Sequence, residues 1–147
     1  MEEQIRFMQK SDLNRCAELL EDAYTKEPYN EKFIPDSALK YIQDKFNVGK
    51  EYSFVFLLDN KIVGFIIARL SHWANGSQAI MEEIVFDEKV RGKGYAKKIT
   101  EHLEKYFKEK GVRSGMLWVK RDSAAHKFHL KNNYQEANDL VVMFKEF

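Results

Sequence analysis

The chain has little cysteine and no long apolar run. Its 147 residues include one cysteine, Cys16, so no disulfide can form within the chain. Cys16 falls on the apolar face of a predicted helix, where a small core residue is expected. No run of about 18 apolar residues occurs, which argues against a membrane-spanning helix. The acidic start, Met1-Glu2-Glu3, lacks the apolar region of a signal peptide. We therefore expect a soluble, cytoplasmic protein.

The chain also lacks an excess of either charge. It has 24 basic and 23 acidic residues, for a net charge of +1, so nothing in the composition points to a nucleic-acid partner. Linkers, internal repeats and low-complexity tracts are missing too. The length suits one domain, 1–147, and 44% hydrophobic residues are enough for a packed core.

Hydrophobic periodicity and turn signals predict an α/β fold. The expected helices are 12–23, 35–46, 94–110 and 123–131, and the expected strands are 5–8, 52–58, 62–70, 78–86, 116–119 and 140–144. Turns at Asp59-Asn60-Lys61 and Asn75-Gly76 predict two hairpins. The strand–helix–strand unit over 78–119 should be a parallel crossover. The result is a mixed, mostly antiparallel sheet flanked by helices.

A glycine loop joins the strand 78–86 to the helix 94–110. The loop and first helical turn read Arg91-Gly92-Lys93-Gly94-Tyr95-Ala96, followed by Lys97. Backbone N–H groups at a helix N-terminus are unpaired and suit a phosphate or pyrophosphate. Glycine lets the backbone approach such an anion closely, and Lys93 and Lys97 add positive charge.

Spacing separates this loop from two common nucleotide-binding motifs. A P-loop requires four residues between its first Gly and a Gly-Lys-Ser/Thr, which the chain lacks. The dinucleotide fingerprint requires a third glycine where Lys97 stands. The pattern that fits is Arg/Gln-x-x-Gly-x-Gly/Ala, met by Arg91, Gly94 and Ala96. It resembles the acyl-CoA-binding signature of the GCN5-related N-acetyltransferases (GNAT family).

A second segment, 122–134, is similar to the Asn-x-x-Ala-x-x-Phe-Tyr-x-Lys-x-Gly-Phe segment of the same family. Its matching positions are Ala125, Phe128, Lys131 and the aromatic Tyr134. Asp122 replaces Asn, His129 replaces Tyr and Asn133 replaces Gly. The element order also agrees, so the resemblance covers nearly the whole chain. It implies a GNAT-type acyl-CoA N-acyltransferase fold and acetyl-CoA as acyl donor, with no metal.

The resemblance also implies where the cofactor lies. A bulge in the strand before the loop frees backbone groups in the family, and Ile84, Val85 and Phe86 occupy those positions. The expected cofactor-binding residues are therefore Ile84, Val85, Phe86, Arg91, Gly92, Lys93, Gly94, Tyr95, Ala96, Lys97, Asp122 and Phe128.

The implied reaction is direct attack of an amine on the thioester, which needs a proton acceptor and a donor to sulfur. Glu82 and Glu83 are candidate bases, and Glu82 is preferred. Adjacent strand residues face opposite sides, but a bulge disturbs this parity, so the choice stays open. His129 occupies the place of the family's acid tyrosine and is the candidate acid, with simple packing as the alternative.

The expected acceptor site lies in the loop 24–34. Glu27, Tyr29 and Glu31 there, together with Trp73, would suit a cationic amine, although the loop could equally be solvated. The partner is expected to be a small-molecule or peptide amine, with no nucleic acid or membrane, and a homodimer is compatible with the resemblance. Polyamine, aminoglycoside, amino acid and protein amines all stay open. The alternatives to N-acetyl transfer are another acyl donor, an O-acceptor, or a non-catalytic acyl-CoA-binding module, which the histidine at 129 keeps open.

Overall fold

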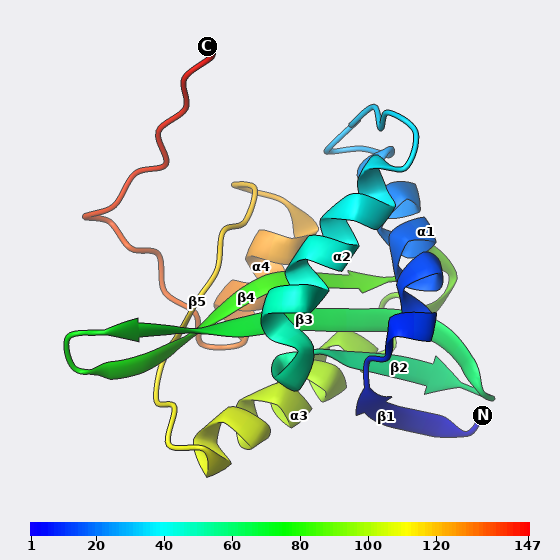
Figure 1. The fold of residues 1–147 in the computed structure, drawn as a ribbon, viewed down its shortest axis with the longest axis horizontal. Coiled ribbons are helices and arrows are strands. Elements are labelled where there is room, and N and C mark those ends of the chain that lie inside the picture. Colours follow the sequence, from blue (N-terminus) through cyan, green and yellow to red (C-terminus); the bar gives the residue numbers. More distant parts are fainter.

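The computed structural model describes residues 1–147 as a five-stranded sheet covered by helices (Figure 1). The strands are β1 (Glu3–Phe7), β2 (Phe54–Leu58), β3 (Lys61–Trp73), β4 (Gly76–Phe86) and β5 (Gly115–Met116). The helices are α1 (Leu13–Tyr24), α2 (Ser37–Gly49), α3 (Tyr95–Glu109) and α4 (Ala124–Lys131). Short 3-10 helices cover Lys10–Asp12, Lys50–Tyr52 and Glu88–Val90. None of the helices has the length and apolar character that a membrane crossing requires.

The sheet order is β1-β2-β3-β4-β5, and only the last pair is parallel. The mixed, mostly antiparallel sheet and the parallel crossover from β4 through α3 to β5 are therefore confirmed. The β4–β5 ladder is short, because only Ala79 pairs with Gly115 and Ile80 with Met116. Beyond these two pairs the strands part, and a cleft opens between them.

Both faces of the sheet are buried, which explains why β2 has no hydrophobic alternation. Val55 and Leu57 of β2 pack with α1 and α2 in one core cluster. Phe54, Phe56 and Leu58 pack with α3 in the other. The helices thus form one layer on each side, and the sheet between them holds the N-terminus of α3 next to the end of β4 (Figure 1).

A β-bulge interrupts β4 in the middle of its ladder with β3. Ile67 pairs with Glu83 but the next residue, Ala68, pairs with Met81, so Glu82 is the extra residue. The family resemblance implied a bulge in this strand at Ile84, Val85 and Phe86; a bulge is present, but it lies at Glu82, and those three residues pair regularly with β3. The bulge changes the side-chain parity of the strand at the two adjacent glutamates, and it bends the strand locally.

Two strand predictions differ from the structure. The strand expected over 116–119 is shortened to Gly115–Met116, because the chain splays from β4 after Met116. The strand expected over 140–144 is wrong, since none of residues 135–147 pairs with the sheet and a hydrogen-bonded turn spans Ala137–Leu140. Apolar, β-branched composition favours a strand only where an open edge lies within reach. Helix α2 also begins at Ser37, after Pro35 rather than with it.

Candidate functional site

The glycine loop forms a row of unpaired backbone donors. Gly92 and Gly94 adopt φ values of 77° and 83°, and α3 begins immediately afterwards at Tyr95. None of the backbone N–H groups of residues 92–97 donates a hydrogen bond within the chain. A Cβ placed on Gly92 or Gly94 would meet no atom within 4 Å, so the loop is open on that side. Six unpaired N–H groups at a helix N-terminus fit the pyrophosphate of acetyl-CoA.

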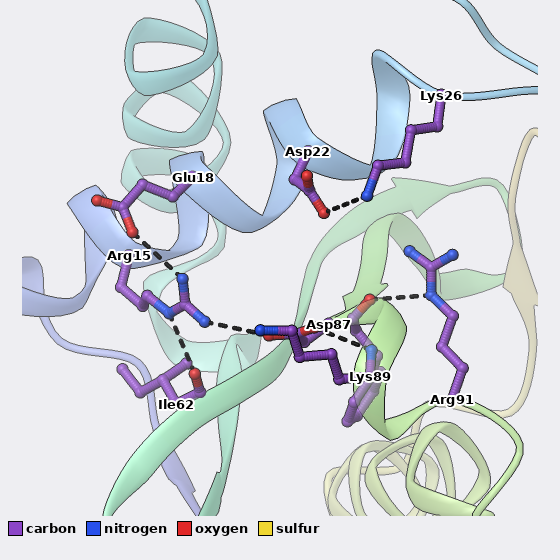
Figure 2. Close-up of polar contacts among 9 residues, drawn as sticks. Arg15, Glu18, Asp22, Lys26, Ile62, Asp87, Lys89 and Arg91 are labelled. Carbon is purple, nitrogen blue, oxygen red and sulfur yellow. Dashed lines mark hydrogen bonds and ion pairs between the residues drawn. The ribbon is translucent and has the colours of Figure 1, made fainter.

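The start of this loop is tied to the rest of the domain by side chains (Figure 2). Asp87 accepts a hydrogen bond from the backbone N–H of Lys89 at 3.0 Å, and Arg15 of α1 lies 3.5 Å from the same carboxylate. Arg91 donates from Nε to the carbonyl oxygen of Phe86 at 3.1 Å. These contacts hold the turn between β4 and α3 in place, so the N–H groups that follow it are preorganised.

A cleft of about 320 Å³ opens where β4 and β5 part. Its walls come from α1, α2, β4, the segment after β5 and α4, which contribute Tyr24, Tyr29, Tyr41, Lys45, Met81, Glu82, Glu83, Ile84, Leu117, Trp118, Val119, Lys120, Ala125 and His129. Leu117, Trp118 and Val119 take part in no backbone hydrogen bond. Their free amides and carbonyls can serve an extended chain with amide groups, such as pantetheine, lying between the strands.

Glu83 is the carboxylate that two tyrosines hold in this cleft. Tyr24 of α1 donates its hydroxyl to Oε2 at 2.9 Å, and Tyr41 of α2 donates to Oε1 at 2.7 Å. Burial raises the pKa of Glu83 above its ordinary value, although the two tyrosine hydrogen bonds oppose this shift and the nearby Glu82 adds to it. A carboxylate with a raised pKa is a better proton acceptor.

Glu82 is the extra residue of the bulge and directly precedes Glu83, but it is in a different electrostatic environment. Arg69 Nε lies 2.6 Å from Oε1 and Lys45 Nζ lies 3.1 Å from Oε2, and the side chain is only 7% exposed. Burial alone would raise the pKa of Glu82, but the hydrogen bonds from Arg69 and Lys45 outweigh it and lower the pKa. A carboxylate bound by two cations is a poor proton acceptor. This geometry therefore disfavours Glu82 as the base, although Glu82 was the candidate preferred from the sequence.

His129 reaches the cleft from α4 and is 4% exposed. Its ring lies edge-on to Phe128 and to Tyr134, with centroids 5.1 and 5.3 Å away, and Nδ1 has no hydrogen-bond partner. Burial lowers the pKa of His129, and the neighbouring His126 lowers it further. The imidazole is therefore neutral near pH 7. It can still donate one N–H, but the imidazolium acid expected from the sequence is disfavoured.

Several expected site residues lie apart from the cleft. Trp73 is 80% exposed at the end of β3, on the protruding β3–β4 hairpin (Figure 1). Glu27 and Glu31 are exposed, and of the expected loop residues only Tyr29 lines the cleft. Asp122 precedes α4 with φ of 62° and donates its backbone N–H to His126, so its side chain has no contact with the cleft. Phe128 is half-buried behind His129.

The structure adds residues that the sequence reading missed, above all Tyr24, Tyr41 and Lys45. Tyr24 continues the apolar stripe of α1 four residues after Leu20. A tyrosine on such a stripe buries its ring and needs a hydrogen-bond partner for its hydroxyl. That signal could have indicated a buried polar group opposite α1, but not which one.

Comparison with known proteins agrees with this geometry. Residues 13–134 match the model of the Acetyltransferase (GNAT) family. The comparison with curated proteins finds no matching sequence.

Solved structures share the fold at low identity. A possible acetyltransferase from Clostridium difficile 630 is similar at 18% identity, covering 99% of this chain and 98% of that one, with a TM-score of 0.82. A predicted acetyltransferase with acetyl-CoA from Clostridium acetobutylicum is similar at 13% identity, with coverages of 97% and 96% and a TM-score of 0.78. The aminoglycoside N-acetyltransferase AAC(6')-Iy in complex with CoA is similar at 20% identity, with coverages of 99% and 95% and a TM-score of 0.74.

Proposed function

Because the chain belongs to the GNAT family of acetyltransferases, we propose that it transfers the acetyl group of acetyl-CoA to a primary amine by direct attack in a ternary complex. The observation that carries this proposal is the buried Glu83 carboxylate, held by Tyr24 and Tyr41 in a cleft along β4, the strand that leads into the glycine loop. The cleft therefore holds a proton acceptor and free backbone groups suited to the cofactor's amides, and the loop after the same strand holds donors suited to its phosphates.

The cofactor-binding residues have distinct roles in this proposal. The unpaired N–H groups of residues 92–97 receive the pyrophosphate, with Lys93 and Lys97 adding charge. The open backbone of β4 at Ile84 and of residues 117–119 flanks the pantetheine chain. The cofactor supplies the reactive thioester carbonyl, and the protein orients that carbonyl toward the acceptor amine.

Glu83 accepts the proton that the amine loses as its nitrogen bonds to the thioester carbon. The C–S bond then breaks, the acetyl group stays on nitrogen and the thiolate of CoA leaves. The raised pKa of Glu83 matches it to this role, directly or through one water. Glu82 instead holds Arg69 and Lys45 at the wall of the cleft, which makes it a positioning residue.

His129 serves as a neutral donor to the departing sulfur. A neutral imidazole has one N–H, and donating it stabilises a thiolate without a full positive charge. The position of His129 in the cleft and its lowered pKa both support a neutral N–H donor rather than an imidazolium acid.

The acceptor amine enters between aromatic walls. Tyr24, Tyr29, Tyr41 and Trp118 all line the cleft, and the rings of Tyr24 and Tyr29 lie 4.5 Å apart. Aromatic faces attract an ammonium group before it is deprotonated. Aminoglycosides belong in any acceptor survey because one similar structure is an aminoglycoside N-acetyltransferase, although at 20% identity that likeness shows the fold alone.

The experiment is an acceptor panel with product mass as the readout. The purified chain is incubated with acetyl-CoA and, in turn, polyamines, aminoglycosides, amino acids and peptides, while CoA release is followed. A product 42 Da heavier than one amine, formed only with the protein, supports the proposal (roughly the mass of an acetyl group replacing a proton). Tight acetyl-CoA binding with no CoA release from any acceptor would instead indicate a binding module. Acetylation of hydroxyls alone would indicate an O-acceptor.

A further inference from the structure

The wall of the cleft carries a cation close to the proposed base. Lys45 of α2 lines the cleft together with Glu82 and Glu83. Its Nζ lies 5.4 Å from the centroid of the Tyr41 ring, and the hydroxyl of the same ring donates to Glu83 at 2.7 Å. One tyrosine ring thus connects the cation with the proposed base. A molecule bound with its amine at Glu83 therefore lies beside Lys45.

Lys45 has donors left for a second anion. Its ammonium group has three N–H donors, and Glu82 is its ion-pair partner, at 3.1 Å. The Lys45 side chain is 33% exposed, whereas Glu82 is largely covered, so a molecule in the cleft meets the cation before the carboxylate. Arg69 of β3 is the second cation on Glu82, at 2.6 Å, and is absent from the cleft lining. Two cations and one carboxylate give this group of three side chains a net positive charge.

The remaining charges at the cleft do not suit a polycation. Lys120 adds another exposed lysine to the lining, so three cations stand against two carboxylates even when Glu83 is ionised. The acidic loop residues Glu27 and Glu31 are absent from the lining. A site for a polyamine or an aminoglycoside needs an excess of negative charge, because every further ammonium group must be paired or stay solvated. The charges here instead suit an acceptor that carries an anionic group beside its amine.

We propose that the acceptor is a small amino acid whose carboxylate binds Lys45 while its amine lies at Glu83. This inference rests on the proposed function and names its acceptor class. A carboxylate and an amine in one molecule complement a cation and a carboxylate in one cleft, and binding at both ends orients the amine for attack. The cleft of about 320 Å³ must also hold the thioester end of the cofactor, which favours a small acceptor.

The test compares acceptors that differ in the carboxylate. The common α-amino acids, β-alanine and γ-aminobutyrate are each assayed beside the corresponding amide and the decarboxylated amine. The amide has a more acidic ammonium group than the amino acid and the decarboxylated amine a less acidic one, so the basicity of the amine cannot explain a loss in both. The kcat/KM of the best amino acid should exceed that of both analogues by roughly 10- to 100-fold, the usual effect of a hydrogen bond to a charged group.

Two substitutions show whether Lys45 is responsible for this preference. Lys45→Gln should lower kcat/KM for the amino acid to the level of its two analogues. Arg69→Gln is the matched control: it also removes one cation from Glu82, but from outside the cleft, so the preference should remain. Survival of the preference in Lys45→Gln, or its loss in Arg69→Gln as well, would overturn the inference.

Calorimetry on the unmodified chain saturated with CoA separates this inference from the proposed function, because CoA has no acetyl group to transfer. The amino acid should bind more tightly than its amide and its decarboxylated amine, by a similar factor. That binding preference without acetyl transfer to any amine would overturn the proposed function while supporting Lys45 as a carboxylate-binding residue. Transfer to polyamines or aminoglycosides with no advantage for any amino acid would keep the proposed function and overturn this inference. Neither transfer nor a binding preference would overturn both.

Discussion

The hydroxyl of Tyr41 lies 2.7 Å from Oε1 of Glu83. Helix α2 thereby holds a carboxylate of β4, and Tyr24 of α1 holds its other oxygen at 2.9 Å. Both donors are neutral, so they orient the carboxylate without placing a full positive charge on it. Glu82, one residue away, is instead held by two cations. The two neighbouring carboxylates are thus shifted in opposite directions, which is the pattern expected where one acts as a base and the other as a structural ion.

The first prediction compares the two glutamates. Glu83→Gln should lower kcat by about 10²-fold or more, because the amine loses its proton acceptor. Glu82→Gln should have the smaller effect on kcat, since that carboxylate holds Arg69 and Lys45 rather than a reacting proton. Steady-state kinetics of both variants, with acetyl-CoA binding measured in parallel, checks this. A larger loss of kcat in Glu82→Gln than in Glu83→Gln would indicate that Glu82 is the base.

The second prediction concerns the two tyrosines. Hydroxyl donors stabilise the ionised form of Glu83, so Tyr24→Phe or Tyr41→Phe should raise its pKa still further. The base works only when ionised, and activity falls as pH drops through its pKa. The acidic limb of the pH–kcat profile should therefore move to higher pH, by about one unit for each hydrogen bond lost. All profiles should be measured with the same acceptor amine, because its own protonation also depends on pH. If the acidic limb stays in place in both variants, the two tyrosines do not control the pKa of the base.

The third prediction tests the glycine loop with a matched control. Gly94→Val should weaken acetyl-CoA binding strongly, because a side chain would fill the open side where the backbone meets the pyrophosphate. At φ of 83° the substitution is also strained, by roughly 1–2 kcal/mol. Gly111→Val introduces the same strain at φ of 80°, but at the far end of α3. Calorimetry should show affinity lost in the first variant and kept in the second, while equal affinities would refute the loop assignment.

The fourth prediction concerns His129. His129→Phe should keep acetyl-CoA affinity, because the shape of the ring is preserved, and should lower kcat through loss of the N–H donor. His129→Tyr restores a donor and should recover part of the activity. NMR of the ring should show a neutral imidazole at pH 7, in line with its lowered pKa. If His129→Phe turned over at the full rate, the histidine would be a packing residue and sulfur would leave without its help.

The fifth prediction concerns stability. Asp12 accepts hydrogen bonds from both terminal nitrogens of Arg6, at 2.7 and 3.0 Å, and one from the backbone of Gln9. Burial alone would raise the pKa of Asp12, but these hydrogen bonds lower it below its ordinary value. Asp12→Asn should therefore lower the free energy of unfolding by about 2 kcal/mol at neutral pH.

The same shift predicts how that difference depends on pH. Because the folded pKa is depressed, the stabilisation is present above about pH 4 and is lost as pH falls through the lowered value. Urea melts at several pH values should show the two proteins converging in acid. Asp22→Asn is the control: its ion pair with Lys26 is about half exposed and screened by solvent, so its loss should change the stability little at any pH. A difference that stays constant down to pH 2 would contradict the role of the charge.

Local chemistry was enough to predict most of the fold. Helix α3 was expected at 94–110 and is observed at Tyr95–Glu109. Its boundaries are set by Gly94 and Gly111, whose positive φ values mark a helix start and stop that few other residues accept. The glycine loop was located in the same way, because its donors follow from the backbone geometry of one short segment.

The choice between Glu82 and Glu83 depends on the register of β4 against β3, where the extra residue of the bulge reverses the side-chain parity. Register is set by pairing between strands, so no pattern within β4 alone could reveal it. The tyrosines that hold Glu83 come from α1 and α2, and only the packing of both helices on the sheet brings their hydroxyls together.

The sequence by itself determined the element order up to the last helix and the position of the anion-binding loop, because each depends on neighbours along the chain. Only the tertiary structure decided which carboxylate is ion-paired and which is held by neutral donors. It also decided that Leu140–Phe144 is exposed and pairs with no strand of the sheet. The physical reason is the same in both cases: strand pairing and electrostatic environment are properties of segments far apart in the sequence, and a strand-forming segment becomes a strand only when a partner edge is within reach.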